Sequence, residues 1–214
     1  MTESKRLLPI YREFDSSISA LVTKAKLTGY RIPCKRGCDA CCYDLANVTQ
    51  FEIVPIIEHV RTWSHDEREG LKERMLEWIR RIKGVGLNPA NPESSIKTFY
   101  SAKAACPFLD RNKRVCTIYD IRPLSCRGHY LIDQDPKVCS NRDKKPTIQN
   151  LVVDDLVVST CVKLARSFED VKGTVAVGIA PLPAMLLKAW VLIKNPKKSV
   201  GSWLQEIVEN AQNA

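Results

Sequence analysis

Apolar residues recur at intervals of three and four positions along much of the chain, which is the period of an amphipathic helix. The pattern is clearest over residues 4–28, 64–83 and 151–168. A shorter apolar run begins near Pro181, and another apolar face surrounds Trp203. Each of these segments predicts a helix, so we expect a mainly α-helical protein.

Capping signals mark the start of two predicted helices. Ser64 is followed three residues later by Glu67, and Thr49 stands in the same relation to Glu52. In such capping boxes each side chain accepts a hydrogen bond from the backbone of the other residue at the first turn. The first pair predicts the start of the 64–83 helix, and the second pair predicts a helix over 50–63.

Two short apolar segments have the pattern of β-strands rather than of helices. Phe108-Leu109 and Val115 to Tyr119 flank a polar turn, which predicts a small β-hairpin. The hairpin would bring Cys106 and Cys116 near each other. The fold class that we expect is therefore mainly α with a small β-hairpin, a compact helical domain organised round a cysteine metal site.

The segment 173–193 contains 21 largely apolar residues and raises the question of a membrane span. Pro181, Pro183 and Lys188 interrupt it, and the helical part is too short to cross a bilayer. We expect a buried core helix and no membrane span.

Eight of the nine cysteines form two groups. The groups are Cys34, Cys38, Cys41 and Cys42, and then Cys106, Cys116, Cys126 and Cys139. The N-terminus is charged and no apolar signal segment follows it, so we expect a cytoplasmic protein with reduced thiols. Clustered cysteines in that compartment bind metal more often than they form disulfides. We predict that the two groups meet in space and hold metal.

The adjacent pair Cys41 and Cys42 constrains the kind of centre. Neighbouring side chains on a helix diverge by about 100°, which is awkward for two ligands of one small ion. The pair suits a multi-metal centre, or one ligand beside a second thiol, or a structural Cys42 buried as a small apolar residue. His129, three residues after Cys126, is either a further ligand or a hydrogen-bonding neighbour of the ligands. Cys161 falls on an apolar helix face and is expected to be a core thiol.

The second cysteine group lies in a distinctive context. Its motif elements are Cys106-Pro107-Phe108-Leu109, Cys116, Ile118-Tyr119, Arg122-Pro123 and Cys126-Arg127. Together with the first group they resemble the YkgJ-like cysteine-cluster family, whose members are described as zinc- or iron-chelating and carry the pattern CxxCxxCC. Three residues separate Cys34 from Cys38, where the family has two. The resemblance covers roughly residues 34–130 and implies metal chelation, without indicating a reaction or a partner.

The spacing of the thiols bears on the metal. Zinc modules use four ligands and often show two CxxC pairs, whereas here only Cys38 and Cys41 have that spacing. A compact run with scattered single cysteines suits an iron–sulfur cluster, which is also held by thiolates. We therefore predict an iron–sulfur cluster, with zinc as the alternative.

The domain prediction is a cysteine-cluster metal-binding domain over residues 1–146 with a helical segment, 147–214, packed on it. The predicted function is metal binding in a structural, electron-transfer or metal-delivery role. One alternative is a metal-dependent enzyme, since larger relatives of the resembled family are linked to protein lysine methylation, although no Gly-rich cofactor loop is present.

The net charge of +9 supports a second alternative, a basic nucleic-acid-binding module. No sequence signature of a known nucleic-acid reader accompanies that charge. Several basic residues lie next to cysteines, where they would offset the negative charge of metal-bound thiolates. Nucleic acid is thus not indicated by a motif, and a protein partner stays open.

Overall fold

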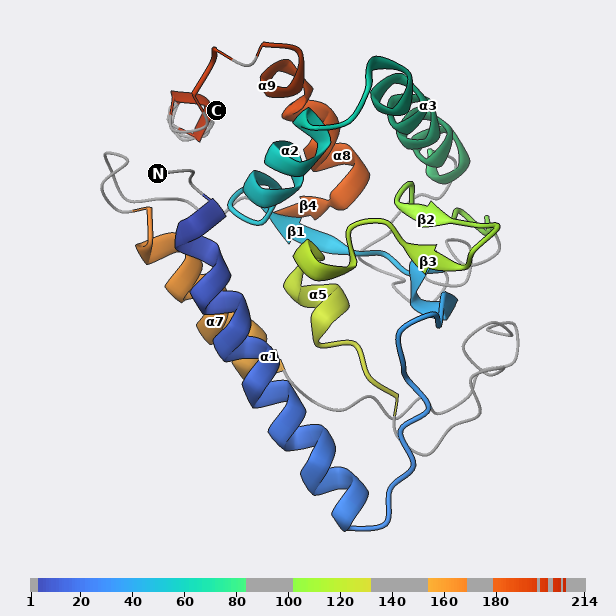
Figure 1. Cartoon of the computed structure of the whole chain (residues 1–214), viewed down its shortest axis with the longest axis vertical. Helices are drawn as coiled ribbons and strands as arrows, with labels where there is room; N and C mark the ends of the chain where they lie inside the picture. The colour runs from blue at the N-terminus through green and yellow to red at the C-terminus, as the bar shows by residue number, and fades with distance from the viewer. Residues whose placement is uncertain are drawn as a thin grey trace.

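The computed structural model describes residues 4–83, 102–131, 154–168, 179–195, 197–199, 202–204 and 206. The α-helices are α1 (Ser4–Leu27), α2 (Ile53–Arg61), α3 (His65–Ile82), α5 (Leu124–Arg127), α7 (Asp154–Arg166), α8 (Leu182–Lys188) and α9 (Trp190–Lys194). Two short 3₁₀ helices are η1 (Ala40–Tyr43) and η2 (Tyr119–Ile121). The strands are β1 (Asn47–Thr49), β2 (Leu109–Asp110), β3 (Val115–Cys116) and β4 (Ile179–Pro181). The mainly helical class with a small hairpin is confirmed (Figure 1).

The first and third helices form where local signals predict them. The buried face of α1 carries residues three and four positions apart: Leu7, Tyr11, Phe14 and Ile18. Gly29 follows with φ +92°, a left-handed conformation that glycine adopts without strain. At the start of α3 the predicted capping box is present, with reciprocal hydrogen bonds between Ser64 and Glu67.

The start of α2 differs from the prediction. Thr49 and Glu52 do form the expected hydrogen bonds, with Thr49 N 2.8 Å from Glu52 Oε2. The helix nevertheless begins at Ile53 rather than at residue 50, because Thr49 belongs to strand β1. Glu52 Oε1 also accepts a hydrogen bond from Leu124 N at 2.7 Å, so this buried carboxylate joins β1 to the start of α5.

A second two-stranded sheet was not predicted. Strand β1 pairs antiparallel with β4, with Val48 opposite Ala180. The strands lie about 130 positions apart in the chain, so no local turn signal announces their pairing. The apolar segment after Pro181 also differs, because Ala189 separates α8 from α9 where one helix was expected.

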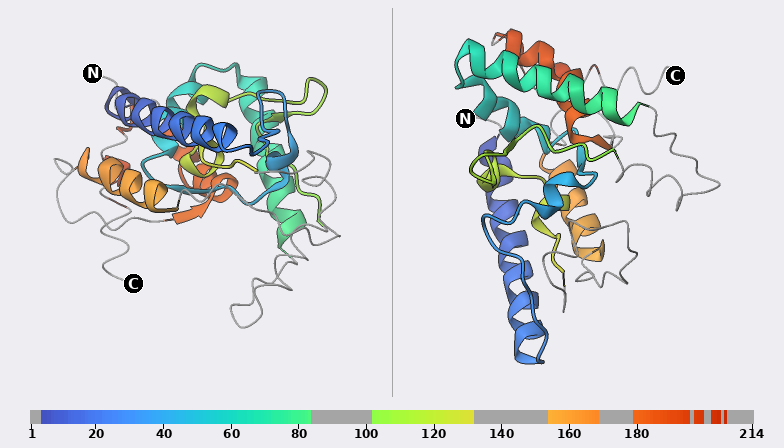
Figure 2. Two further views of the ribbon diagram at one scale, coloured as in Figure 1. Left: turned by 90° about the horizontal axis from the view of Figure 1, so that it is seen from below. Right: turned by 90° about the vertical axis from the view of Figure 1, so that its right-hand side faces the viewer.

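The helices pack on one hydrophobic core. Helix α7 lies against α1, α2 lies against α8 and α9, and α3 crosses α8 (Figures 1 and 2). Phe51 stacks on Phe168 with 5.1 Å between ring centroids, so the C-terminal part shares the core of the N-terminal part. The predicted domain boundary at residue 146 lies outside the described residues. None of the helices that the structure describes has the length and apolar character needed to cross a membrane.

Substitution of Glu52 tests the hydrogen bonds that this side chain makes. In Glu52→Gln one of the two acceptor oxygens becomes a donor, so the backbone N–H of Thr49 or of Leu124 loses its partner. We expect the free energy of unfolding to fall by about 1–3 kcal/mol, the usual cost of a buried unsatisfied group. Chemical denaturation followed by circular dichroism measures it. The same change at the surface residue Glu69 should have little effect, and equal effects at both positions would contradict the assignment.

Candidate metal centre

The first cysteine group lies in a turn that leads into a short 3₁₀ helix. Cys38 N donates to the carbonyl of Lys35 at 3.1 Å, and Gly37 within this turn has φ +89°. Cys41 and Cys42 follow in η1, where Cys42 N donates to the carbonyl of Asp39 at 2.9 Å. This backbone conformation folds the four thiols of the group into one compact loop.

The second group comes from the hairpin and α5. Cys106 precedes β2, and its N–H donates to the carbonyl of Cys42 at 2.6 Å, which joins the two groups through the backbone. Cys116 lies in β3 opposite Leu109, and Cys126 lies in α5. The predicted hairpin therefore brings Cys106 and Cys116 to the same side of the molecule as Cys42.

Two adjoining cavities contain the thiols of both groups in their walls. One is lined by Cys34, Cys38, Cys41, Cys126 and His129, among others. The other is lined by Cys38, Cys41, Cys42, Cys106, Cys116 and Cys126, among others. Seven of the eight predicted ligands thus surround one small region, and Cys38, Cys41 and Cys126 line both cavities. The eighth, Cys139, lies outside the described residues.

The thiols surround these cavities without closing on a single point. In the described part of the chain, no three Cys, His, Asp or Glu side chains are grouped closely enough to hold one metal ion. Ligands of one zinc ion lie about 2.3 Å from it and hence close to one another. The site is therefore identified by the type of its donors and by the cavities that they line.

Burial determines the protonation of most of these thiols. It raises the pKa of Cys106 to about 12 and also raises the pKa of Cys34, Cys116 and Cys126. These thiols therefore hold their protons at neutral pH in the absence of a cation. A metal would have to displace those protons, which couples metal binding to pH.

Cys41 and Cys42 contact each other, contrary to the divergence expected of neighbouring helical residues. Their side chains share a hydrogen bond, which lowers the pKa of Cys41 and raises the pKa of Cys42. In this hydrogen bond the Cys42 thiol donates to the sulfur of Cys41, which stabilises the thiolate form of Cys41. Cys41 is thus the thiol of this pair that is closest to its metal-binding, deprotonated form.

A stack of cationic and aromatic side chains crosses the edge of the thiol region. The guanidinium carbon of Arg122 lies 4.0 Å from the ring centroid of Tyr119, and that of Arg36 lies 4.8 Å from it. Arg122 lines both thiol cavities, and its positive charge favours the thiolate forms of Cys34 and Cys116 against the effect of burial. Its buried Nε–H has no hydrogen-bond acceptor among the residues that the structure describes. Arg122 therefore supplies positive charge and a spare donor where thiolates would gather.

A second contact holds the hairpin against the first cysteine loop. Arg114 donates two hydrogen bonds to Asp39, from Nε at 3.1 Å and from Nη2 at 2.6 Å. The interaction lowers the pKa of Asp39. From the sequence, Arg114 was expected only to offset the negative charge of metal-bound thiolates. Neither residue of this contact carries a local signal of it, because the two lie far apart in the chain.

Two further predicted residues are placed by the structure. His129 lies in the wall of the first cavity, with Nε2 3.5 Å from Asp44 Oδ2, so its imidazole has a carboxylate neighbour at the edge of the thiol region. Cys161 lies in α7, partly buried against the hydrophobic core, and lines neither thiol cavity. Burial raises the pKa of Cys161 to about 11, as expected of a packed thiol. The prediction of a core role for Cys161 is consistent with this position.

Residues 33–145 match a family model described as "CxxCxxCC: Putative zinc- or iron-chelating domain". The chain belongs to this family. The matched range of the chelating domain contains all eight cysteines of the two groups and excludes Cys161. No curated protein and no solved structure matches the chain.

The donor set of the chelating domain fits the metals in the family description. Thiolates are ligands of zinc and of iron–sulfur clusters, and the region offers seven described thiols beside one imidazole. Carboxylates that would favour calcium or magnesium are few here, with Asp44 the carboxylate that lines the second cavity. The residues present therefore suit a soft or borderline metal.

Proposed function

We propose that this protein binds an iron–sulfur cluster between its two cysteine groups, with zinc as the alternative occupant. The ligands would come from Cys34, Cys38, Cys41, Cys42, Cys106, Cys116 and Cys126, with Cys139 as the remaining predicted ligand. Thiolates bind the iron of such clusters. The cluster would supply redox chemistry, and the residues of the chain would position and shield it.

The observation that carries this proposal is the enclosure of one region by thiols from sequence positions as distant as Cys41 and Cys116. The number of thiols supports a polynuclear cluster over one tetrahedral zinc ion, since seven described cysteines line the cavities and one zinc ion takes four donors. The spare Nε–H of Arg122 supports an anionic occupant, since hydrogen bonds to the sulfur atoms of clusters tune their potential.

The proposed role is structural, electron-carrying or metal-delivering, in the cytoplasm. The described walls of the two cavities come from the first cysteine loop, the hairpin and residues 119–131, and no described residue of α7, α8 or α9 lines them. Such a position leaves a bound group within reach of a protein partner. Residues 147–214 would then serve to complete the hydrophobic core of residues 1–146.

Anaerobic purification with metal and sulfide analysis tests the proposal. We expect a brown protein with broad absorbance near about 400 nm that bleaches on reduction, with matching iron and acid-labile sulfide. Cys161→Ala, which removes a thiol outside the region, should have the same spectrum and metal content. A colourless protein with stoichiometric zinc would exclude the cluster but keep chelation. A protein that binds neither metal after reconstitution would refute both.

A further inference from the structure

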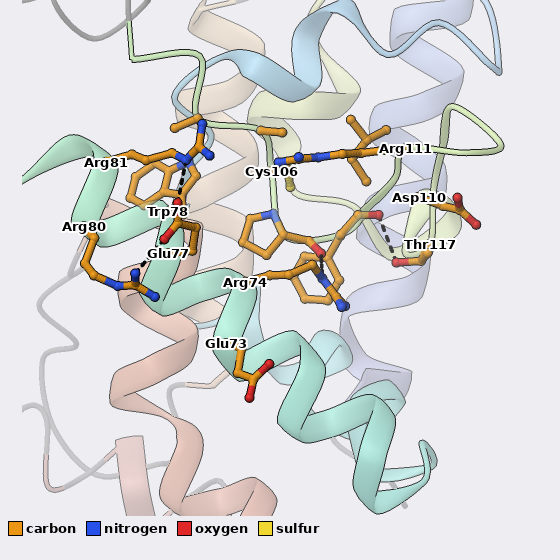
Figure 3. Close-up of a pocket in the computed structure, with 15 residues that line it drawn as sticks. Glu73, Arg74, Glu77, Trp78, Arg80, Arg81, Cys106, Asp110, Arg111 and Thr117 are labelled. Atoms are coloured by element: carbon orange, nitrogen blue, oxygen red, sulfur yellow. Dashed lines mark hydrogen bonds and ion pairs between the residues drawn. The ribbon is translucent and has the colours of Figure 1, made fainter.

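A third, larger cavity lies on the far side of the segment that carries Cys106. It occupies about 630 Å³ between helix α3 and residues 104–111, with Thr117 at one edge. This volume is in the range of small-molecule binding sites. Figure 3 shows charged side chains of α3 on one wall and Arg111, from the hairpin turn, extending over the cavity from the other.

Positive charge is in excess at one end of this cavity. Arg80 and Arg81 each contact Glu77 at 2.8 Å, on different carboxylate oxygens. The hydrogen bond from Arg81 is the main reason that the pKa of Glu77 is lowered, and the charges of Arg80 and Arg111 act in the same direction. Two guanidinium groups therefore contact one carboxylate, which can neutralise only one of them, and Arg111 adds a third positive charge to the lining of the cavity.

The same guanidinium groups retain unused hydrogen-bond donors. Each guanidinium carries five N–H donors, and the contact to Glu77 uses one from Arg80 and one from Arg81. Arg111 is exposed and forms no salt bridge with a described residue. A planar anion such as a carboxylate or phosphate is the partner that matches several guanidinium forks at once.

The acidic groups at the other side of the cavity do not cancel this excess. Asp110 accepts hydrogen bonds from the backbone of Asn112 and Lys113, and its carboxylate lies 3.9 Å from Lys113 Nζ. Glu73 stands one turn before Glu77, beside Arg74, whose Nε donates to the carbonyl of Pro107 at 2.8 Å. Among the described residues, Glu77 is thus the one carboxylate that contacts the guanidinium groups of Arg80 and Arg81.

Apolar groups form the floor. Trp78 is 3% exposed, and it lies in the wall together with Ala104, Ala105 and Pro107. A ligand whose anionic group contacted the arginines would place its adjoining atoms against this surface. The combination of a cationic end and an apolar floor favours an organic anion over a bare inorganic ion.

We propose that this cavity is a binding site for a small organic anion, with a carboxylate or phosphate held between Arg81 and Arg111 and an apolar body against Trp78 and Pro107. Cys106 lines both this cavity and the second thiol cavity. The bound anion would therefore lie against the segment that also presents a predicted metal ligand. The anion site itself does not depend on whether a metal is bound.

Ligand-observed NMR titration at low ionic strength tests the site with phenyl phosphate, benzoate and the neutral benzyl alcohol. We expect saturable binding of phenyl phosphate or benzoate, and the tighter of the two identifies the anionic group. Arg111→Gln should weaken binding about tenfold, since each charge-assisted contact contributes on that scale. Glu77→Gln should strengthen binding severalfold, because it removes the carboxylate that competes for the arginines.

Arg12→Gln is the matched control, since it removes one positive charge from an exposed position of α1 that lines none of the cavities described above. It should leave the affinity unchanged, and circular dichroism should show that all variants are folded. The proposal is wrong if neither anion binds saturably, if benzyl alcohol binds as well as the anions, or if Arg111→Gln and Arg12→Gln behave alike. It is also wrong if Glu77→Gln weakens binding, because that sign would indicate a structural effect.

Discussion

Cys41→Ser is expected to lose most of the bound metal and to unfold at a clearly lower denaturant concentration than the wild-type protein. Cys41 lines both thiol cavities, and its pKa is lowered by the hydrogen bond from Cys42, so it is the thiol best prepared to bind. A serine hydroxyl of similar size is a far poorer ligand for zinc or iron. The substitution therefore removes a donor while it preserves the packing.

The stability effect follows from the coupling of metal binding to folding. The binding of structural zinc contributes about 10–16 kcal/mol to the free energy of folding of small metal-dependent domains. The loss of one central ligand removes a large part of this contribution. Metal analysis by mass spectrometry and urea denaturation of the same samples measure both quantities. Treatment of the wild-type protein with a chelator should lower its stability to about the level of Cys41→Ser.

Cys161→Ser is the matched control for that substitution. It makes the same chemical change at a thiol that packs on the core in α7 and lines neither thiol cavity. It should keep its metal while losing a little stability through the buried hydroxyl. Full metal content in Cys41→Ser, or metal loss of the same size in Cys161→Ser, would show that the thiol cavities are not the metal site.

The sequence predicted the elements whose signals are local. The apolar period of α1 and the capping box at Ser64 depend on residues within one or two helical turns, and both appear as expected. The hairpin was also predicted, because its polar turn lies between two short apolar segments. The pairing of β1 with β4 has no such signal, since it depends on contacts between distant parts of the chain.

The thiol region was predicted in outline from the two cysteine groups and from the family resemblance. Its electrostatic surroundings were not predicted in detail. The stacking of Arg36 on Tyr119 and the contact of Arg114 with Asp39 join segments about 75 to 85 positions apart. Exposed charges have no periodicity that identifies their partners, so these contacts require the folded chain.

Thr49 and Glu52 show how a correct local interaction can accompany a wrong element boundary. Their reciprocal hydrogen bonds form as predicted, yet the helix starts at Ile53. The pairing of β1 with β4 holds Thr49 in an extended conformation, so a tertiary contact determines the boundary. The same carboxylate also reaches Leu124 N, a role that the capping pattern alone does not reveal.

Arg127→Met is expected to lower the free energy of unfolding by about 2–4 kcal/mol, because it removes a buried cation that joins α1 to the segment of the second cysteine group. Arg127 is 5% exposed. Its Nη1 lies 2.5 Å from Asp15 Oδ2, its Nε donates to the carbonyl of Arg122 at 2.8 Å, and its Nη2 donates to the carbonyl of Asp120. Methionine has a side chain of similar length but leaves both carbonyls without this donor.

The position of Arg127 next to Cys126 gives the substitution a second readout. Both residues lie in α5, and Arg127 holds the backbone of Arg122, which lines the thiol cavities. Metal content should therefore fall as well, though less than in Cys41→Ser. Asp15→Asn keeps both backbone contacts of Arg127 and changes a half-exposed carboxylate, so it should cost about 1 kcal/mol or less. If Asp15→Asn destabilises as much as Arg127→Met, the ion pair rather than the backbone contacts joins the two segments, and the expected hierarchy is wrong.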